Sequence, residues 1–168
     1  MKILLFGFVV LFCSTMIHAD IYALKGGVLA HSEGPVSSGK EQGYDLNIEV
    51  LLEDDYLQAN WAFGADINNQ SDTSFIYSGL NWEGLFFETF IWEFFLGIAT
   101  HDGEISTTDT TKRAFGSRVL FREAVAIGIE LSESITVTFI YDHYSHTGID
   151  DRINQGNDNS GIRLAYYF

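Results

Sequence analysis

Eight segments of the 168-residue sequence alternate between apolar and polar side chains over most of their length. They lie at about residues 20–31, 41–52, 57–67, 73–83, 86–99, 114–131, 134–146 and 159–168. Alternation with a period of two is typical of β-strands that bury one face. After residue 19 there is no apolar run of the roughly 20 residues that a membrane-spanning helix needs. We therefore predict an all-β fold.

The connections between these segments are alternately long and short. The first, third, fifth and seventh are polar and mostly long: SEGPVSSGKE, NNQSDT, HDGEISTTDTTK and TGIDDRINQGND. The others are EDDY, a few residues near Glu83–Leu85, and LSES. Outer-membrane barrels have an even number of antiparallel strands, short periplasmic turns and long extracellular loops. The sequence therefore predicts an eight-stranded antiparallel transmembrane β-barrel of the bacterial outer membrane, with both ends of the barrel chain on the periplasmic side.

Apolar side chains share one face in several segments, as expected for a wall that meets lipid. The clearest rows are Phe90, Trp92, Phe94, Leu96 and Ile98; Ile135, Val137, Phe139 and Tyr141; and Ile162, Leu164, Tyr166 and Phe168. Glu93 and Arg163 fall on the opposite face. The alternative is a soluble β-sandwich or lipocalin-like barrel, in which these rows face inward, but so many aromatic side chains would be hard to bury in so small a core. Glu123 is an exception, because its position in the alternation places a carboxylate in the lipid-facing row.

The N-terminal residues have the features of a secretory signal peptide. Lys2 is followed by an apolar run at residues 3–12 and by the small residue Ala19, so we expect cleavage between Ala19 and Asp20. Residues 20–168 are then a single barrel domain. The formal net charge of −14 argues against nucleic acid as a partner, because like charges repel.

The hairpin formed by the last two segments carries a histidine, a serine and an aspartate. His143 and Ser145 continue the outward row of the seventh segment, with backbones about 6.6 Å apart at about 3.3 Å per residue. The antiparallel register that pairs Phe139 with Ile162 also pairs His143 with Asp158. Serine, histidine and a carboxylate together form a hydrolytic unit, in which histidine takes the serine proton and the carboxylate orients the ring. The alternative is that all three are ordinary polar residues at the membrane rim.

The stretch YDHYSHTGI…NQGND…GIRLAYYF resembles the C-terminal signature of the lipid A 3-O-deacylases, the PagL-like acyloxyacyl hydrolases. Weaker likeness runs through FIWEFFLGIA and GSRVLFREAVAIGIEL. The resemblance implies an outer-membrane serine esterase that removes the ester-linked 3-hydroxyacyl chain at position 3 of lipid A. It also implies that Ser145 is the nucleophile, His143 the base and Asp158 the acidic member. Asn154, Gly156 and Asp158 match the family's Asn-x-Gly-x-acid element.

One position departs from the family pattern, and it concerns the oxyanion donors. The family commonly has asparagine after the serine, whereas this chain has His146. Loss of one oxyanion donor costs about 10²- to 10³-fold in rate. His146, Asn154, Gly156 and backbone amides are the candidates for oxyanion or substrate binding. The histidines have no spacing with acids that suggests a metal site, so we expect neither a metal nor another cofactor.

The partner that the resemblance implies is lipid A, or lipopolysaccharide, in the outer leaflet. Homodimerisation through lipid-facing aromatic side chains would be compatible with such a barrel. Two other functions remain open at this point. One is a non-catalytic structural or adhesive barrel whose long loops carry the function, and the other is a phospholipase that uses the same three residues.

Overall fold

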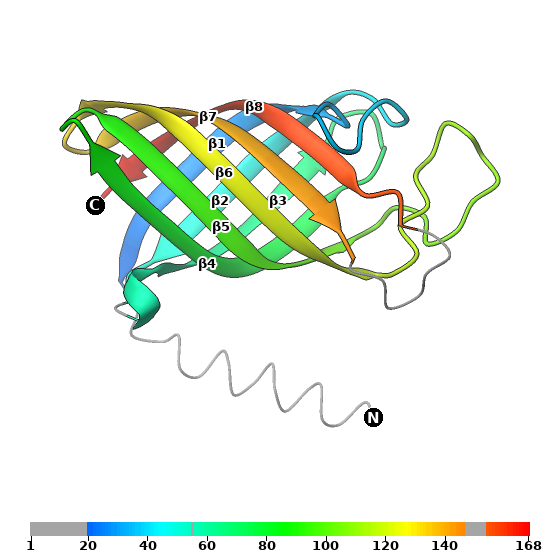
Figure 1. Ribbon diagram of the computed structural model, residues 1–168, viewed down its shortest axis with the longest axis horizontal. Helices are drawn as coiled ribbons and strands as arrows, with labels where there is room; N and C mark the ends of the chain where they lie inside the picture. The colour runs from blue at the N-terminus through cyan, green and yellow to red at the C-terminus, as the bar shows by residue number, and fades with distance from the viewer. Residues whose placement is uncertain (1–19, 55, 147–153) are drawn as a thin grey trace.

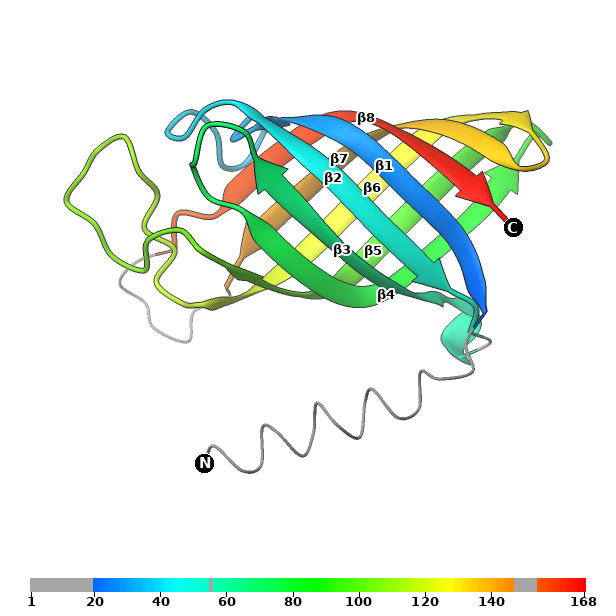
Figure 2. The same cartoon turned by 180° about the vertical axis from the view of Figure 1, so that it is seen from behind.

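The computed structural model describes residues 20–54, 56–146 and 154–168, which form a closed β-barrel. The predicted signal peptide at residues 1–19 lies outside the described residues. Each strand is antiparallel to its neighbours in the sequence, and β8 closes the barrel on β1 (Figures 1 and 2). The strands are β1 Ile21–His31, β2 Tyr44–Leu52, β3 Asn60–Asn68, β4 Phe75–Phe86, β5 Phe90–His101, β6 Val119–Ser132, β7 Ile135–Ser145 and β8 Asn157–Tyr167. The prediction of an eight-stranded antiparallel barrel is confirmed.

The two ends of the barrel differ in the length of their connections. The C-terminus and the short turns lie at one end, and the long loops lie at the other (Figure 1). The long connections are residues 32–43, 69–74, 102–118 and 146–156, of which 147–153 are outside the described residues. Strand β6 begins five residues later than predicted, because residues 114–118 belong to the loop before it, and β2, β3 and β5 begin three to four residues later. In the described part of the chain, no helix is long and apolar enough to cross a membrane.

The turn between β4 and β5 is not near Glu83, where the sequence suggested it. Strand β4 continues to Phe86, because Glu83 points into the barrel and its carboxylate accepts a hydrogen bond from Lys25 Nζ at 2.9 Å. Phe87 and Glu88 have φ angles of 52° and 61° and make the turn. The turn therefore lies nearer the C-terminus than the sequence suggested, and β4 stays paired with β5 as far as Phe86 and Phe90.

The apolar rows face outward, as predicted. In β5 the side chains of Trp92 and Ile98 are 42% and 56% exposed, whereas Glu93 between them is 4% exposed. In β7 Phe139 is 51% exposed, whereas its neighbour Ile140 is 1% exposed. A soluble fold with these rows packed inside is therefore excluded by the direction of the side chains.

Ion pairs and hydrogen bonds fill the barrel interior. Lys25 Nζ lies 2.7 Å from Glu93 Oε2, and Arg163 Nη1 lies 3.1 Å from Glu49 Oε1. Nearer the long loops, Arg122 Nη2 lies 3.0 Å from Asp142 Oδ2. Eight-stranded barrels are narrow enough for side chains to fill them. The middle of the barrel is therefore a packed polar core. A cavity of about 320 Å³ lies at the short-turn end, lined by Glu83, Thr136 and Tyr167 among others, at the opposite end of the barrel from His143.

Candidate active site

The hairpin of β7 and β8 has the register that the sequence predicts. Phe139 is paired with Ile162, and His143 is paired with Asp158. His143 Nδ1 lies 2.6 Å from Asp158 Oδ1. The imidazole is 16% exposed and the carboxylate 0% exposed. The two side chains therefore form a short, largely desolvated pair on the outer side of the barrel wall.

This pair fixes the orientation of the imidazole. A carboxylate only accepts hydrogen bonds, so the proton of the short bond belongs to His143 Nδ1. The lone pair of the neutral ring is then on Nε2, which is the atom that can act as a base. The arrangement has the geometry of the histidine–carboxylate half of a serine hydrolase triad.

Ser145 is the third member of the predicted set, and it ends β7 on the face that carries His143. Its side chain is half-buried and its cross-strand partner in β6 is Phe121. Among the residues that the structure describes, no hydrogen bond joins Ser145 Oγ to His143. Catalytic hydrogen bonds are often long in a ligand-free site and shorten when substrate binds. The fold thus places hydroxyl and imidazole on one face, next to a row of exposed apolar side chains.

The first long loop, residues 32–43, holds the other side of Asp158. Asp158 Oδ2 accepts hydrogen bonds from the backbone amides of Val36 at 2.7 Å and Ser37 at 2.8 Å. The backbone amide of Asp158 donates to Ser37 O at 3.1 Å. One oxygen of the carboxylate is therefore used by the loop and the other by the imidazole. Sequence reasoning missed these loop residues, since an irregular loop has no periodicity from which a contact can be predicted.

Gly156 lies against the same pair. Its φ of 58° is in the left-handed region, and a Cβ there would be 2.8 Å from Ser37 Oγ and 3.2 Å from His143 Cε1. Glycine is the residue that both the backbone conformation and the available space allow. The glycine of the Asn-x-Gly-x-acid element thus permits the last loop to approach the imidazole edge.

Asn154 and His146 are linked to each other. The backbone amide of His146 donates to Asn154 Oδ1 at 3.3 Å, and Asn154 Nδ2 donates to the carbonyl oxygen of His146. Asn154 is exposed, whereas the His146 side chain is buried. The asparagine joins the two ends of the last loop beyond the serine. Its role as an oxyanion donor, and that of His146, stay predictions.

Glu123 faces outward, so its unusual place in the sequence pattern is real. It is exposed, lies between Phe121 and Val125 on the outer face of β6, and is paired with His143 in β7. Glu123, His143 and Asp158 are therefore consecutive partners across three strands. No β-bulge between β6 and β7 displaces Glu123, because the register shift in this pair occurs between Glu130 and Ser132.

The family assignment comes from the sequence match to a protein family. The family profile described as lipid A 3-O-deacylase (PagL) matches residues 41–167, which is most of the chain. The chain belongs to the lipid A 3-O-deacylase family. No curated protein sequence matches this family member.

Solved structures similar to this lipid A 3-O-deacylase family member are outer-membrane barrels. The outer membrane enzyme PagL has a TM-score of 0.61 and 13% sequence identity, covering 87% of this chain and 99% of that one. Neisserial surface protein A has a TM-score of 0.59 and 9% identity, covering 88% of this chain and 97% of that one. At these identities the likeness concerns the fold alone. The family and the fold together locate the protein in the bacterial outer membrane.

Proposed function

We propose that this protein is an outer-membrane serine esterase that removes the ester-linked 3-hydroxyacyl chain at position 3 of lipid A. The observation that supports it most strongly is the His143–Asp158 pair, at 2.6 Å, beside Ser145 on the lipid-facing side of the wall. Family membership supplies the reaction class. The three side chains supply a nucleophile, a base and an orienting carboxylate for it.

The reaction proceeds in two stages. In the first, Ser145 Oγ attacks the ester carbonyl carbon while His143 Nε2 takes the hydroxyl proton. The tetrahedral intermediate collapses to an acyl-serine, and the proton passes from His143 to the departing lipid A hydroxyl. In the second stage His143 takes a proton from water, which attacks the acyl-serine. The acyl–oxygen bond to Ser145 breaks, the proton passes from His143 Nε2 back to Ser145 Oγ, and the 3-hydroxy fatty acid leaves. Asp158 keeps the imidazole oriented and stabilises its charged form in both stages.

The outward direction of the site suits a substrate that is itself part of the membrane. Lipid A lies in the outer leaflet, and its acyl esters lie just below the head groups. Lateral diffusion brings such an ester to the barrel wall, where the exposed row ending at Ser145 offers an apolar surface to the acyl chain. The substrate does not need to enter the barrel, because the His143–Asp158 pair and Ser145 lie on the outer side of the wall.

The direct test is the lipid A profile of a Gram-negative host that expresses the protein. Mass spectrometry is expected to show loss of one 3-hydroxyacyl chain with the wild type and no loss with Ser145→Ala. Ser78→Ala is the matched control, because Ser78 faces outward from β4 on another part of the wall, and it should act like the wild type. An unchanged lipid A profile with the wild type would contradict the proposal.

Two further outcomes separate the alternatives. Release of unsubstituted fatty acid from phospholipids, with lipid A intact, would indicate a phospholipase. Purified protein in detergent should keep its activity after treatment with a chelator, because the proposed steps use only side chains and water. Loss of activity that added divalent cation restores would contradict this metal-independent mechanism.

A further inference from the structure

A buried arginine joins three of the four long loops beside Asp158. Arg113 belongs to the loop between β5 and β6, and it is 2% exposed. Its Nη2 donates to Ser32 Oγ at 2.6 Å and to Ser37 O at 3.0 Å in the first long loop. Its Nη1 donates to Gly156 O at 2.6 Å and to Gln155 O at 3.1 Å in the last loop. The planar guanidinium can satisfy several acceptors at once in a fixed geometry.

The segments that Arg113 contacts are the ones that hold the His143–Asp158 pair. Ser37, whose carbonyl accepts from Arg113, donates its amide to Asp158 Oδ2 at 2.8 Å. Gly156, whose carbonyl also accepts from Arg113, lies against the edge of His143. One guanidinium thus fixes the backbone on both sides of the pair, without touching either side chain of it.

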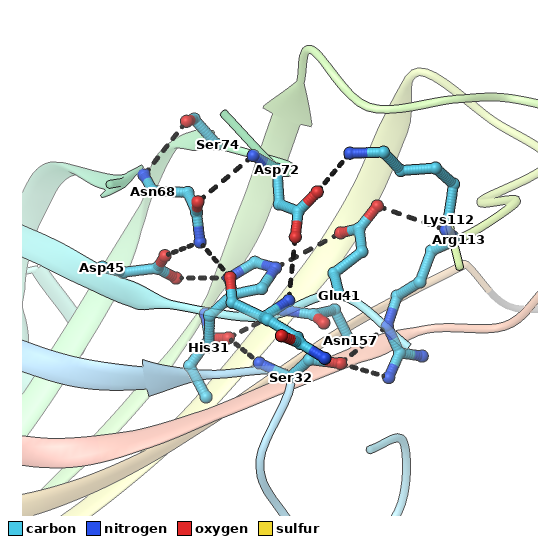
Figure 3. A network of polar contacts seen from close by, with 12 residues as sticks. His31, Ser32, Glu41, Asp45, Asn68, Asp72, Ser74, Lys112, Arg113 and Asn157 are labelled. Carbon is cyan, nitrogen blue, oxygen red and sulfur yellow. Dashed lines mark hydrogen bonds and ion pairs between the residues drawn. The ribbon is translucent and has the colours of Figure 1, made fainter. Parts of the chain in front are cut away.

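The arginine is itself held in place from the barrel rim. Its backbone amide donates to Glu41 Oε1 at 3.2 Å, and Glu41 Oε2 lies 3.2 Å from His31 Nε2 (Figure 3). Burial lowers the pKa of the Arg113 guanidinium, while the negative charges of Glu41 and Asp158 act in the opposite direction. A buried cation is costly unless its donors are satisfied. Arg113 meets this requirement through the two loops.

We propose that Arg113 is a positioning residue, which holds the amides of residues 36 and 37 on Asp158 and thereby keeps Asp158 directed at His143. This inference rests on the proposed function of the Ser145 site. Arg113 does not contact the reacting atoms, so its effect reaches catalysis through the first long loop and the carboxylate. Misplacement of a catalytic group by about 1 Å can cost about 100-fold in rate.

Arg113→Met is the first variant of the test. With purified protein and lipid A in mixed micelles, we expect kcat to fall about tenfold to a hundredfold while KM changes less than twofold, because the substrate does not contact the arginine. Arg113→Lys should show a similar loss, since one ammonium group cannot reach both loops in the same geometry. Arg118→Met is the matched control: Arg118 is in the same loop but donates to His101 O and Gly103 O, near its own loop, and its variant should keep the wild-type kcat.

Gly34→Ala disturbs the same contact, that between the first long loop and Asp158, without changing Arg113. A Cβ at Gly34 would lie 2.5 Å from Asp158 Cβ and 2.6 Å from Asp158 Oδ2, so it should push the first loop away from the carboxylate. If Arg113 acts through this loop, the double variant should be no slower than the slower single variant. A purely structural role for Arg113, unrelated to Asp158, would instead make the two losses multiply.

The results separate failure of this inference from failure of the proposed function. Wild-type kcat in folded Arg113→Met, or multiplicative losses in the double variant, would overturn the role of Arg113 while Ser145→Ala remained inactive. Equal activity of Ser145→Ala and the wild type would overturn the proposed function itself. Heat-modifiable electrophoretic mobility shows which variants form a barrel. If Arg113→Met does not form one, Gly34→Ala still tests the contact between the first long loop and Asp158.

Discussion

The barrel interior and the outer wall near the long loops both contain carboxylates bound to basic side chains, but only one of them is open to a lipid. Inside, Glu93 lies 2.7 Å from Lys25, and this pair is enclosed by the wall. Outside, Asp158 lies 2.6 Å from His143, whose imidazole is partly exposed beside Ser145. The same residue types therefore stabilise the fold in one place and form a candidate catalytic site in the other.

The interior ion pairs and the His143–Asp158 pair differ in their exposure and in whether the basic side chain has a nitrogen left for another hydrogen bond. Interior cations are surrounded by acids, as Arg163 is by Glu49 and Glu93. The imidazole of His143 uses Nδ1 for Asp158; within residues 20–54, 56–146 and 154–168 no hydrogen bond involves its Nε2, the nitrogen that the mechanism assigns to the serine hydroxyl. This contrast makes opposite predictions for the two kinds of ion pair: changes at the His143–Asp158 pair should affect the rate, and changes at the interior pairs should affect stability.

The largest expected effect is that of Asp158→Asn on the rate. The amide can donate to Nδ1 and so favours the wrong tautomer of His143, and the corresponding change in a serine protease triad costs about 10⁴-fold. The barrel should still form, because the side-chain oxygen of asparagine can still accept the hydrogen bonds from the backbone amides of Val36 and Ser37. Deacylation kinetics measure the loss of rate, and heat-modifiable electrophoretic mobility shows whether the barrel forms. A variant that keeps more than a tenth of the wild-type rate would remove the aspartate from the mechanism.

Arg163→Met should show the reverse pattern. Removal of one partner from a buried ion pair costs about 3–5 kcal/mol, so we expect a lower midpoint of urea unfolding in lipid vesicles. The rate per folded molecule should stay within twofold of the wild type, since Arg163 faces the interior. A large fall in rate in fully folded protein would show that the two regions are coupled.

Gly156→Ala should reduce the rate about tenfold to a hundredfold, because the new methyl group displaces a loop that contacts the His143 edge. The strained φ of 58° adds a smaller loss of stability. Gly26→Ala is the control, since a Cβ there meets only Asn47 O at 3.8 Å. Deacylation assays on both proteins make the comparison, and equal rates would show that the space beside the imidazole is unimportant.

The smallest expected effect is that of Glu123→Leu on stability. A carboxylate in a lipid-facing row is unfavourable, but less so than a basic side chain and less so near the rim than at the bilayer centre, so we expect a gain below about 1 kcal/mol. Urea unfolding in vesicles measures it. A loss of stability would instead indicate that Glu123 makes a favourable interaction at this face.

The alternation of side chains was enough to predict the barrel, the outward rows and the pairing of His143 with Asp158, because register and side-chain direction are linked within a sheet. The same reasoning placed the β4–β5 turn too early, since it could not foresee the bond between Glu83 and Lys25. The loop contacts could not be predicted either. Ser37 and Asp158 are 121 residues apart, and irregular loops have no repeating pattern that would indicate their partners.

Covalent labelling shows whether the serine on the outer wall is the nucleophile. Purified protein in vesicles is treated with a long-chain alkyl phosphonate ester, and the modified peptide is located by mass spectrometry. We predict one adduct, on Ser145, that does not form in His143→Ala and forms more slowly in Asp158→Asn. Labelling of another residue, or no labelling of protein that deacylates lipid A, would contradict the assignment of Ser145 as the nucleophile.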